Sequence, residues 1–269
     1  MRHFGVLLRL GNFAPARGSI TAAGVCSSAR MTRLLGILIM STATTLSRLP
    51  LAPSVPTEER GVVHGASWDF YDRLTDAIGD RSSVRIAFDG KDMELVVIGP
   101  VHEGRGNLLD MFVGEVCEGL GLDFHGLGST TWKRPDIARG IEADSSYCFD
   151  PEKVALCRAA YDRGENDGAA FPIPDLAAEI DISPPKIDRP GIYSKLQVPE
   201  VWRFGDEVMS IEQLDRSGNY VVVDASRFLF VRPEEVIRWL REANSMPRPA
   251  WKRAVREWAR AELHPRAGL

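Results

Sequence analysis

Apolar residues first recur at helical spacing after Ser67, where Trp68, Tyr71 and Leu74 mark one face of a short helix that Gly79 ends. The same spacing marks a second helix that ends among Gly119 and Gly121. Three further helices are predicted around residues 192–196, 234–242 and 251–263.

Alternating or continuous apolar stretches predict strands between these helices. Residues 84–88 and 93–98, joined by the turn signal Asp89-Gly90, have the composition of a β-hairpin. Further strands are predicted at residues 124–132, 141–149, 176–183, 200–204, 208–214 and 220–223. A stretch rich in Gly and Asp, residues 163–169, is expected to be a loop. Strands interspersed with helices predict an α/β or α+β fold.

The first 57 residues differ from the rest, because they contain arginines but no Asp or Glu. Such a segment is not expected to join the fold. Three interpretations stay open: a weak signal-peptide core at Leu34–Met40, a transit-like leader, or translation that begins at Met31 or Met40. We favour a start at Met40. The apolar run is far shorter than the ~20 residues of a spanning helix, so no transmembrane segment is expected.

The composition changes this picture little. The chain is 44% apolar and 26% charged, which is typical of a globular protein, and its net charge of −4 argues against coating nucleic acid by bulk charge. The four cysteines form no C-x-x-C pair, so no zinc ribbon or disulfide scaffold is indicated and a reducing cytoplasm fits best. The sequence contains no P-loop, GxGxxG or GxSxG motif.

Two of the predicted strands carry pairs of carboxylates. Because side chains alternate along a strand, Glu142 and Asp144 project to one side of the first strand. In the second strand Glu179 and Asp181 lie opposite a face formed by Leu176, Ala178 and Ile180. Carboxylates on apolar strands repel one another, and a hard divalent cation such as Mg²⁺ would offset that charge. The simpler interpretation, a solvated acidic sheet edge, is the commoner one for any single pair.

Three blocks of sequence favour the interpretation that these carboxylates bind a divalent cation. They are "GASWDFYDRLTDAIGDRSSVRIAFDGKDMELVVIGPVHE", "GSTTWKRPDIARGIEADSSYCF" and "PDLAAEIDISPPKIDRPGIYSKLQVPEVWRF". In this order they resemble the Uma-type family of restriction-endonuclease-like proteins, a branch of the PD-(D/E)XK nuclease superfamily. The resemblance covers residues 58 to about 245 and implies a mixed central sheet flanked by helices, with residues 246–269 as a C-terminal helix.

The resemblance also implies roles for individual residues. Asp144 matches the aspartate of the PD half-motif and Glu179 the acidic residue of the (D/E)XK half-motif, both as metal ligands for Mg²⁺ or Mn²⁺. Glu94 matches a family glutamate that assists the metal. His102 matches a histidine at the start of the second helix, where it either orients water or phosphate or simply caps the helix. Glu142 is a possible accessory carboxylate.

The sequence departs from the motif at one position, because Asp181 stands where the family has lysine. A cation is then expected from the following helix, where Arg189 stands at a position that many relatives give to lysine. Lys186 is a second candidate. Arginine stabilises charge but is a poor proton carrier, so Asp181 is expected to position or deprotonate the attacking water.

These features predict a magnesium-dependent DNA endonuclease. The alternatives are a nuclease-like module that binds DNA or protein without catalysis, and a phosphoesterase acting on RNA or a small nucleotide. Lys133 and Arg134 either contact a DNA backbone or are ordinary solvated charges. A homodimer is expected, with Trp251 and Trp258 either at its surface or packed as a stripe in the core.

Overall fold

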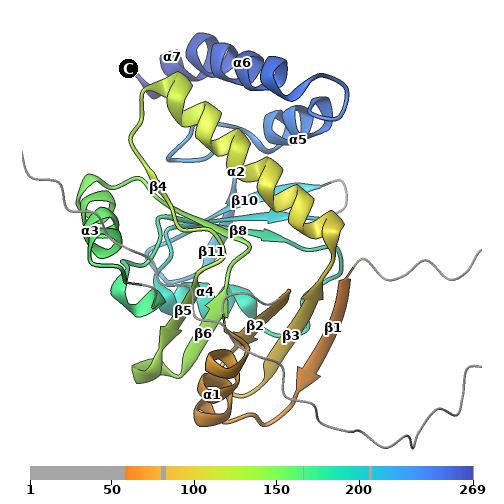
Figure 1. Cartoon of the computed structure of the whole chain (residues 1–269), viewed down its shortest axis with the longest axis vertical. Coiled ribbons are helices and arrows are strands. Elements are labelled where there is room, and N and C mark those ends of the chain that lie inside the picture. The colour runs from red at the N-terminus through yellow and green to blue at the C-terminus, as the bar shows by residue number, and fades with distance from the viewer. Residues whose placement is uncertain (1–57, 80–82, 166, 206–207, 269) are drawn as a thin grey trace, which may run out of the picture. The chain divides into compact units, whose positions relative to one another are not determined.

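The computed structural model describes residues 58–79, 83–165, 167–205 and 208–268, which belong to one compact unit. The predicted leader at residues 1–57 lies outside the described residues. The unit is a mixed α/β structure with two sheets (Figure 1). No helix in the described ranges combines the length and apolar character needed to cross a membrane.

The first sheet is antiparallel, with the strand order β1-β3-β2-β6-β5. Its strands are β1 (Glu58–Val63), β2 (Val84–Phe88), β3 (Met93–Ile98), β5 (Thr131–Arg134) and β6 (Arg139–Glu142). The predicted hairpin is confirmed as β2 and β3. Strand β1 was not predicted, although it borders β3 along six residue pairs.

The second sheet has the order β11-β10-β9-β8-β7-β4, and only β8 and β9 among its neighbours run parallel. Its strands are β4 (His125–Gly126), β7 (Ser145–Cys148), β8 (Leu176–Ile180), β9 (Glu200–Phe204), β10 (Met209–Leu214) and β11 (Tyr220–Val223). The prediction of the last three strands is confirmed to within one residue.

Two predicted strands are each divided between the sheets. Residues 141–149 form β6 in the first sheet and β7 in the second, and the link between them contains Asp144. Its amide donates to the carbonyl of Ala178 in β8 at 3.1 Å, so the link stays tied to the second sheet. Residues 124–132 are likewise divided into β4 and β5. The prediction of two continuous strands was wrong, because apolar alternation does not show where a strand changes sheets.

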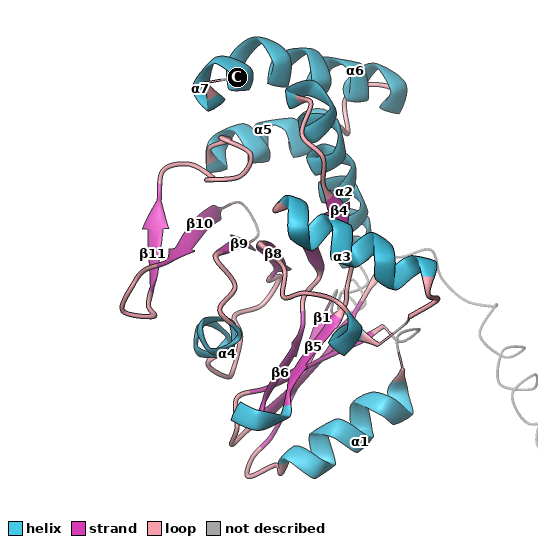
Figure 2. Ribbon diagram, turned by 90° about the vertical axis from the view of Figure 1, so that its left-hand side faces the viewer, coloured by secondary structure: helices cyan, strands magenta, loops and turns pink. Residues whose placement is uncertain are grey.

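The helices cover the sheets on several sides (Figures 1 and 2). They are α1 (Trp68–Ile78), α2 (Pro100–Leu120), α3 (Pro151–Asp162), α4 (Arg189–Leu196), α5 (Pro233–Glu242), α6 (Arg248–Trp258) and α7 (His264–Ala267), with a π-helical segment at Ala259–Leu263. Short 3₁₀ turns occur at Pro135–Ile137 and Gly168–Ala170. Ser67 caps the N-terminus of α1, since its hydroxyl accepts a hydrogen bond from the Phe70 amide at 3.2 Å.

Helix α3 was missed in the sequence. The Asp150 carboxylate caps its N-terminus by accepting from the amides of Glu152 and Lys153, and Pro151 occupies the first turn. Only Val154, Cys157 and Ala160 of this helix are fully buried, so its apolar face is narrow. That weak periodicity explains why the pattern gave no signal.

Strand β8 of the second sheet is buried on both faces. On one side Leu176 and Ala178 of β8 join a core with α2, α5 and α6, and on the other Ala177 packs with residues of α4. Trp251 belongs to the first core, is fully buried and donates its indole N–H to the carbonyl of Trp239 at 2.8 Å. Trp251 therefore contributes to the packing stripe and offers no surface to a second copy.

Helices α2 and α6 approach closely at Gly119. A Cβ atom there would lie 2.6 Å from the Arg256 carbonyl and 2.7 Å from the Ala259 Cβ, whereas one at Gly114 would meet nothing closer than 4.0 Å. We expect Gly119→Ala to lower the free energy of unfolding by about 1–3 kcal/mol through overpacking. Gly114→Ala, the matched control, should raise it by up to ~1 kcal/mol through helix propensity. Urea denaturation of both variants measures the difference, and equal effects would contradict the close packing.

Candidate active site

The eight site residues predicted from sequence lie together where the link between β6 and β7 passes the end of β8. Strands β1 and β3 and the start of α4 border the same region. The predicted residues fall into two groups of contacts. His102, Glu142 and Asp144 lie around Arg85, and Glu94, Glu179, Asp181, Lys186 and Arg189 are linked through Arg60, Arg189 and Glu94.

Asp144 is held at the end of β8 by the backbone. Its Oδ2 accepts a hydrogen bond from the amide of Ile180 at 2.7 Å and lies 3.2 Å from Nε2 of His102. Its Oδ1 lies 3.7 Å from Nε of Arg85, whose Nη1 is 3.0 Å from Oε1 of Glu142. Glu142 and Asp144 therefore contact the same arginine, although the strand predicted to carry both ends at Glu142.

Glu179 is almost fully buried, with 1% of its side chain exposed. One carboxylate oxygen pairs with Arg189 and the other accepts a hydrogen bond from the Tyr193 hydroxyl. Burial raises the pKa of Glu179 to about 7, because the attraction of Arg189 only partly offsets desolvation and the charges of Asp144 and Asp181. Burial also raises the pKa of Asp181, against the lowering effects of Arg189 and Arg60.

Arg189, the first candidate for the expected cation, lies against the carboxylates. Its Nε donates to Oε2 of Glu94 at 2.9 Å, and its Nη1 pairs with Glu179 and lies 3.8 Å from Oδ1 of Asp181. Lys186, the second candidate, points elsewhere: its ammonium donates to the carbonyl of Arg60 at 3.0 Å, and its backbone amide donates to Glu94 at 2.7 Å. Among the two candidates, only Arg189 places its cation against the carboxylates.

Sequence reasoning missed three residues of the centre, which are Glu58, Arg60 and Arg85. Arg60 of β1 donates to Asp181 at 2.8 Å and to Glu94 at 3.2 Å, and it also pairs with Glu58 at 2.6 Å. Arg85 was part of the predicted hairpin but was not singled out. A buried charge within the apolar run Val84–Phe88 is the same kind of signal that identified the acidic pairs, whereas β1 offered no comparable pattern.

Within the described ranges, the carboxylates of this centre outnumber its arginines. The acids are Glu58, Glu94, Glu142, Asp144, Glu179 and Asp181, and the arginines are Arg60, Arg85 and Arg189. If all were ionised, the negative charge would be in excess within a region of low solvent exposure. A bound cation would relieve that excess, which is the electrostatic condition for a metal site.

The carboxylate oxygens of the centre are donors of the kind that Mg²⁺ and Mn²⁺ take. In the described ranges no group of three or more His, Cys, Asp or Glu side chains is arranged as a metal cluster. Magnesium needs fewer protein ligands, because it keeps most of its waters and binds through one or two carboxylates. Asp144 and Asp181 are the carboxylates nearest to solvent at the end of β8, with side chains 7% and 12% exposed.

His102 lies inside the first turn of α2 rather than at its cap, which is Gly99, so the cap interpretation was wrong. Burial alone would lower the pKa of His102, but the hydrogen bond and charge of Asp144 outweigh that effect, and the pKa is raised. The imidazole therefore stays protonated to a higher pH than an ordinary histidine.

We expect Asp144→Asn to bring the pKa of His102 below its ordinary value of 6.5, because burial persists while the carboxylate charge is removed. NMR titration of the imidazole in EDTA measures this, with His102→Gln to assign the signal. The pKa of His125, which burial lowers, should stay unchanged as an internal control. An unchanged pKa at His102 would contradict the pairing with Asp144.

The exposed basic pair outside the centre is already paired with carboxylates. Lys133 Nζ lies 2.8 Å from Asp72 and 2.7 Å from Asp76, and Arg134 lies 2.6 Å from Asp136. These contacts favour the interpretation of Lys133 and Arg134 as surface charges.

The fold and the site define an α+β protein with a buried centre rich in acid and arginine. Comparisons with protein-family models and with curated proteins found no match. The functional proposal therefore depends on the geometry of the centre and on the three sequence blocks.

Proposed function

We propose that this protein is a magnesium-dependent DNA endonuclease with a restriction-endonuclease-like fold of the Uma type. The observation that carries the proposal is the meeting of Asp144 with Glu179 and Asp181 at the end of β8, beside the buried cation of Arg189. Carboxylates from two chain segments around one basic side chain are suited to metal-assisted hydrolysis of a phosphodiester.

Each residue has a role that follows from its contacts. Asp144 and Glu179 would hold the metal, which when bound supplies a hydroxide at neutral pH and offsets charge on the phosphate. Asp181, the residue after the end of β8, is more exposed than Glu179 and its pKa is raised by burial, so it is suited to orient water or accept its proton. Arg189 would offset the charge that develops on the phosphate.

Glu94 was predicted as a metal ligand, and its contacts favour a different role. Its side chain is completely buried and accepts from Arg60, Arg189 and the amide of Lys186. Glu94 is held by two guanidinium groups and is 0% exposed, whereas Asp144 lies near one guanidinium group and is 7% exposed, so Glu94 has less capacity left for a metal. We therefore assign Glu94 to positioning the two arginines against Glu179 and Asp181.

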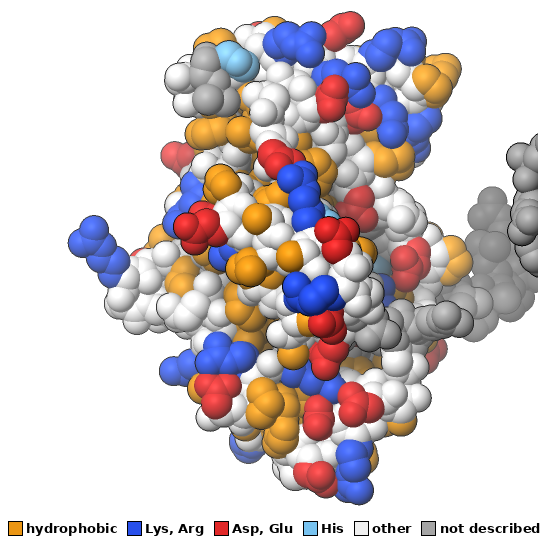
Figure 3. Space-filling model, turned by 60° about the vertical axis from the view of Figure 1, so that its left-hand side comes forward, with side chains coloured by type: hydrophobic (Ala, Val, Ile, Leu, Met, Phe, Trp, Pro, Cys, Tyr) orange, Lys and Arg blue, Asp and Glu red, His pale blue; other side chains and the backbone are white. Residues whose placement is uncertain are grey.

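Charge on the surface supports a nucleic-acid substrate only locally. On the face in Figure 3, acidic and basic side chains are interspersed, and basic ones are frequent over the C-terminal helices. Residues 248–266 contain Arg248, Lys252, Arg253, Arg256, Arg260 and Arg266 against Glu257 and Glu262, although Lys252 and Arg256 pair with Glu115 and Arg266 pairs with Glu235. Helix α2 links the two regions, since Gly119 beside α6 lies about 25 Å from His102 at 1.5 Å per residue. A strand of DNA along α2 would span both regions.

The experiment that tests the proposal is cleavage of supercoiled plasmid by the full chain. Nicking is expected with Mg²⁺ or Mn²⁺ and none with EDTA. Short oligonucleotides and mononucleotides added as competitors separate a DNA enzyme from a phosphoesterase of small nucleotides. Solution mass at micromolar concentration tests the proposed homodimer, which a monomer would exclude under those conditions.

A module that binds DNA without cleaving it is the second candidate. Two observations favour it: the motif lysine is replaced by Asp181, and both oxygens of Glu179 are engaged by Arg189 and Tyr193. A folded protein that shifts plasmid DNA on a gel but never nicks it with either metal would establish this function in place of the nuclease.

A further inference from the structure

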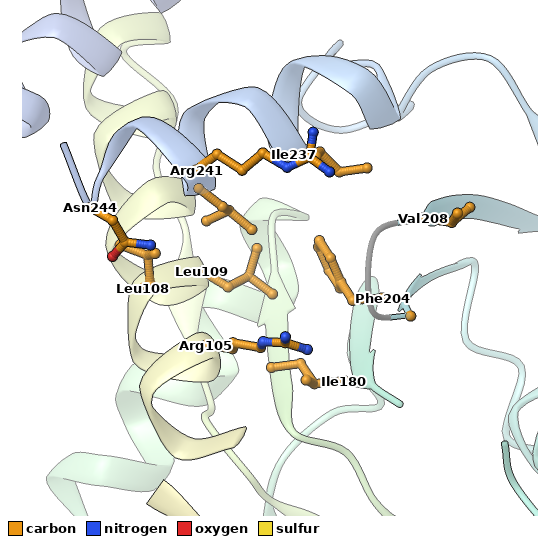
Figure 4. A pocket seen from close by; sticks show the side chains of 11 residues that line it. Arg105, Leu108, Leu109, Ile180, Phe204, Val208, Ile237, Arg241 and Asn244 are labelled. Carbon is orange, nitrogen blue, oxygen red and sulfur yellow. The ribbon is translucent and has the colours of Figure 1, made fainter. Parts of the chain in front are cut away.

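A pocket of about 220 Å³ lies on the other side of β8 from Glu179. Its apolar walls come from α2, α5 and the ends of β8 and β9, and polar side chains stand among them (Figure 4). We call it the α2–α5 pocket, after the helices that supply Arg105, Leu109, Ile237 and Arg241.

Ile180 connects the pocket to the candidate active site. Its backbone amide donates to Asp144, while its side chain lines the pocket beside Phe204. Helix α2 makes a second connection, because His102 contacts Asp144 and Arg105 follows one helical turn later. Ile180 thus connects the pocket directly to Asp144, and α2 connects it to Asp144 through Arg105 and His102.

The lining selects the chemistry of the occupant. Leu109, Ile180 and Phe204 are almost fully buried in the walls and present apolar surface and one aromatic ring. Arg105 and Arg241 add positive charge, and the Asn244 side chain can both donate and accept hydrogen bonds. A flat, partly polar ring attached to a phosphate matches this combination. The volume is below the roughly 300 Å³ of a drug-sized ligand site, so one ring system fits and a base pair does not.

We propose that the α2–α5 pocket binds one unpaired nucleobase of the nucleic-acid substrate, next to the phosphodiester bond at the carboxylates. This inference rests on the proposed nuclease function and extends it to the substrate class: single-stranded, gapped or flipped-out nucleotides are preferred over a fully paired duplex. Stacking on Phe204 and the arginine charges would offset the cost of leaving the base stack.

The test is binding in EDTA, where cleavage does not interfere. The probes are a fluorescein-labelled 12-nucleotide single strand and the blunt duplex of the same sequence, measured by anisotropy with the full chain. A surface that binds only phosphate favours the duplex because of its higher charge density. We expect the opposite order, with the single strand bound at least about fivefold more tightly, which corresponds to stacking of one base.

Two variants locate the binding. Ile237→Trp fills the pocket with a larger ring, and Arg241→Gln removes an exposed charge with little risk to folding. Each should weaken single-strand binding at least about fivefold and leave duplex binding unchanged. The matched controls are Val222→Trp, at a side chain 73% exposed on β11, and Arg216→Gln in the turn before that strand, and neither should alter binding. Thermal unfolding checks that all four variants fold.

The outcomes separate this inference from the nuclease proposal. Single-strand binding that is absent, no tighter than duplex binding, or unaffected by both pocket variants overturns the pocket inference even if plasmid is cleaved. Equal loss for both probes overturns it too, since the variants would then act on general phosphate binding. If the pocket variants lose only single-strand binding and the protein never cleaves plasmid, the pocket inference is supported and the nuclease proposal is rejected.

Discussion

Asp144→Asn is expected to reduce metal-dependent plasmid cleavage by two to three orders of magnitude, roughly the loss of several kcal/mol of charge stabilisation. Asparagine keeps the shape of the side chain and an oxygen that can accept from the Ile180 amide, now at 2.7 Å from Asp144 Oδ2. It removes the negative charge that a divalent cation requires. The fold should therefore survive while catalysis is lost, and initial rates of nicking in Mg²⁺ measure the effect.

Asp123→Asn is the matched control for this variant. Asp123 is 65% exposed, pairs with Arg158 at 2.7 Å and lies outside the centre, so its replacement should leave the nicking rate unchanged. Cleavage that persists in Asp144→Asn at the wild-type rate would assign the activity to another site or to a contaminant. Loss in both variants would point to an effect on the fold and not to loss of a metal ligand.

The acidic pairs could be identified from the sequence because carboxylates are unexpected in otherwise apolar strands. Glu179 lies between Ala178 and Ile180 in a strand that is buried on both faces, and such a residue is retained only where a partner offsets its charge. The pattern indicated that a partner had to exist. It did not indicate which residues the partners are: Arg189 was expected only from the resemblance, and Arg60 and Arg85 were not expected.

Arg60 shows why the rest of the centre escaped prediction. It lies more than 120 positions from Asp181 in sequence and reaches it only because β1 borders β3 and ends beside the second sheet. That pairing is a tertiary fact, and strand β1 has no apolar alternation that would reveal it. The division of residues 141–149 between two sheets is of the same kind, because periodicity describes local structure and not the path of the chain.

The largest effect on stability is expected from Arg189→Met. The Arg189 side chain is 4% exposed and pairs with Glu94 and Glu179, whose side chains are 0% and 1% exposed. Removing one partner of a buried ionic network leaves the others uncompensated, which costs about 3–5 kcal/mol of unfolding free energy. Urea denaturation at pH 8 in EDTA measures this loss, and Arg73→Met, at a surface pair with Asp69, is the control that should change little.

The loss should depend on pH in a defined direction. Arg189 acts to lower the pKa of Glu179, which burial nevertheless raises to about 7, so without the arginine that pKa rises further. A carboxyl whose folded pKa is raised favours the native state when it is protonated and disfavours it as pH rises through that pKa. The deficit of Arg189→Met should therefore be largest at pH 8 and smaller at pH 5.

A second substitution distinguishes uncompensated charge from lost packing. If the deficit arises because Glu179 is left buried and ionised, Arg189→Met combined with Glu179→Gln should recover part of the stability at pH 8. A deficit that is independent of pH and is not reduced in the double variant would mean that Arg189 stabilises the fold through packing. The carboxylates would then have to be solvated. Solvated carboxylates need no cation to offset their charge, so the argument for a cation held between Asp144 and Glu179 would be weaker.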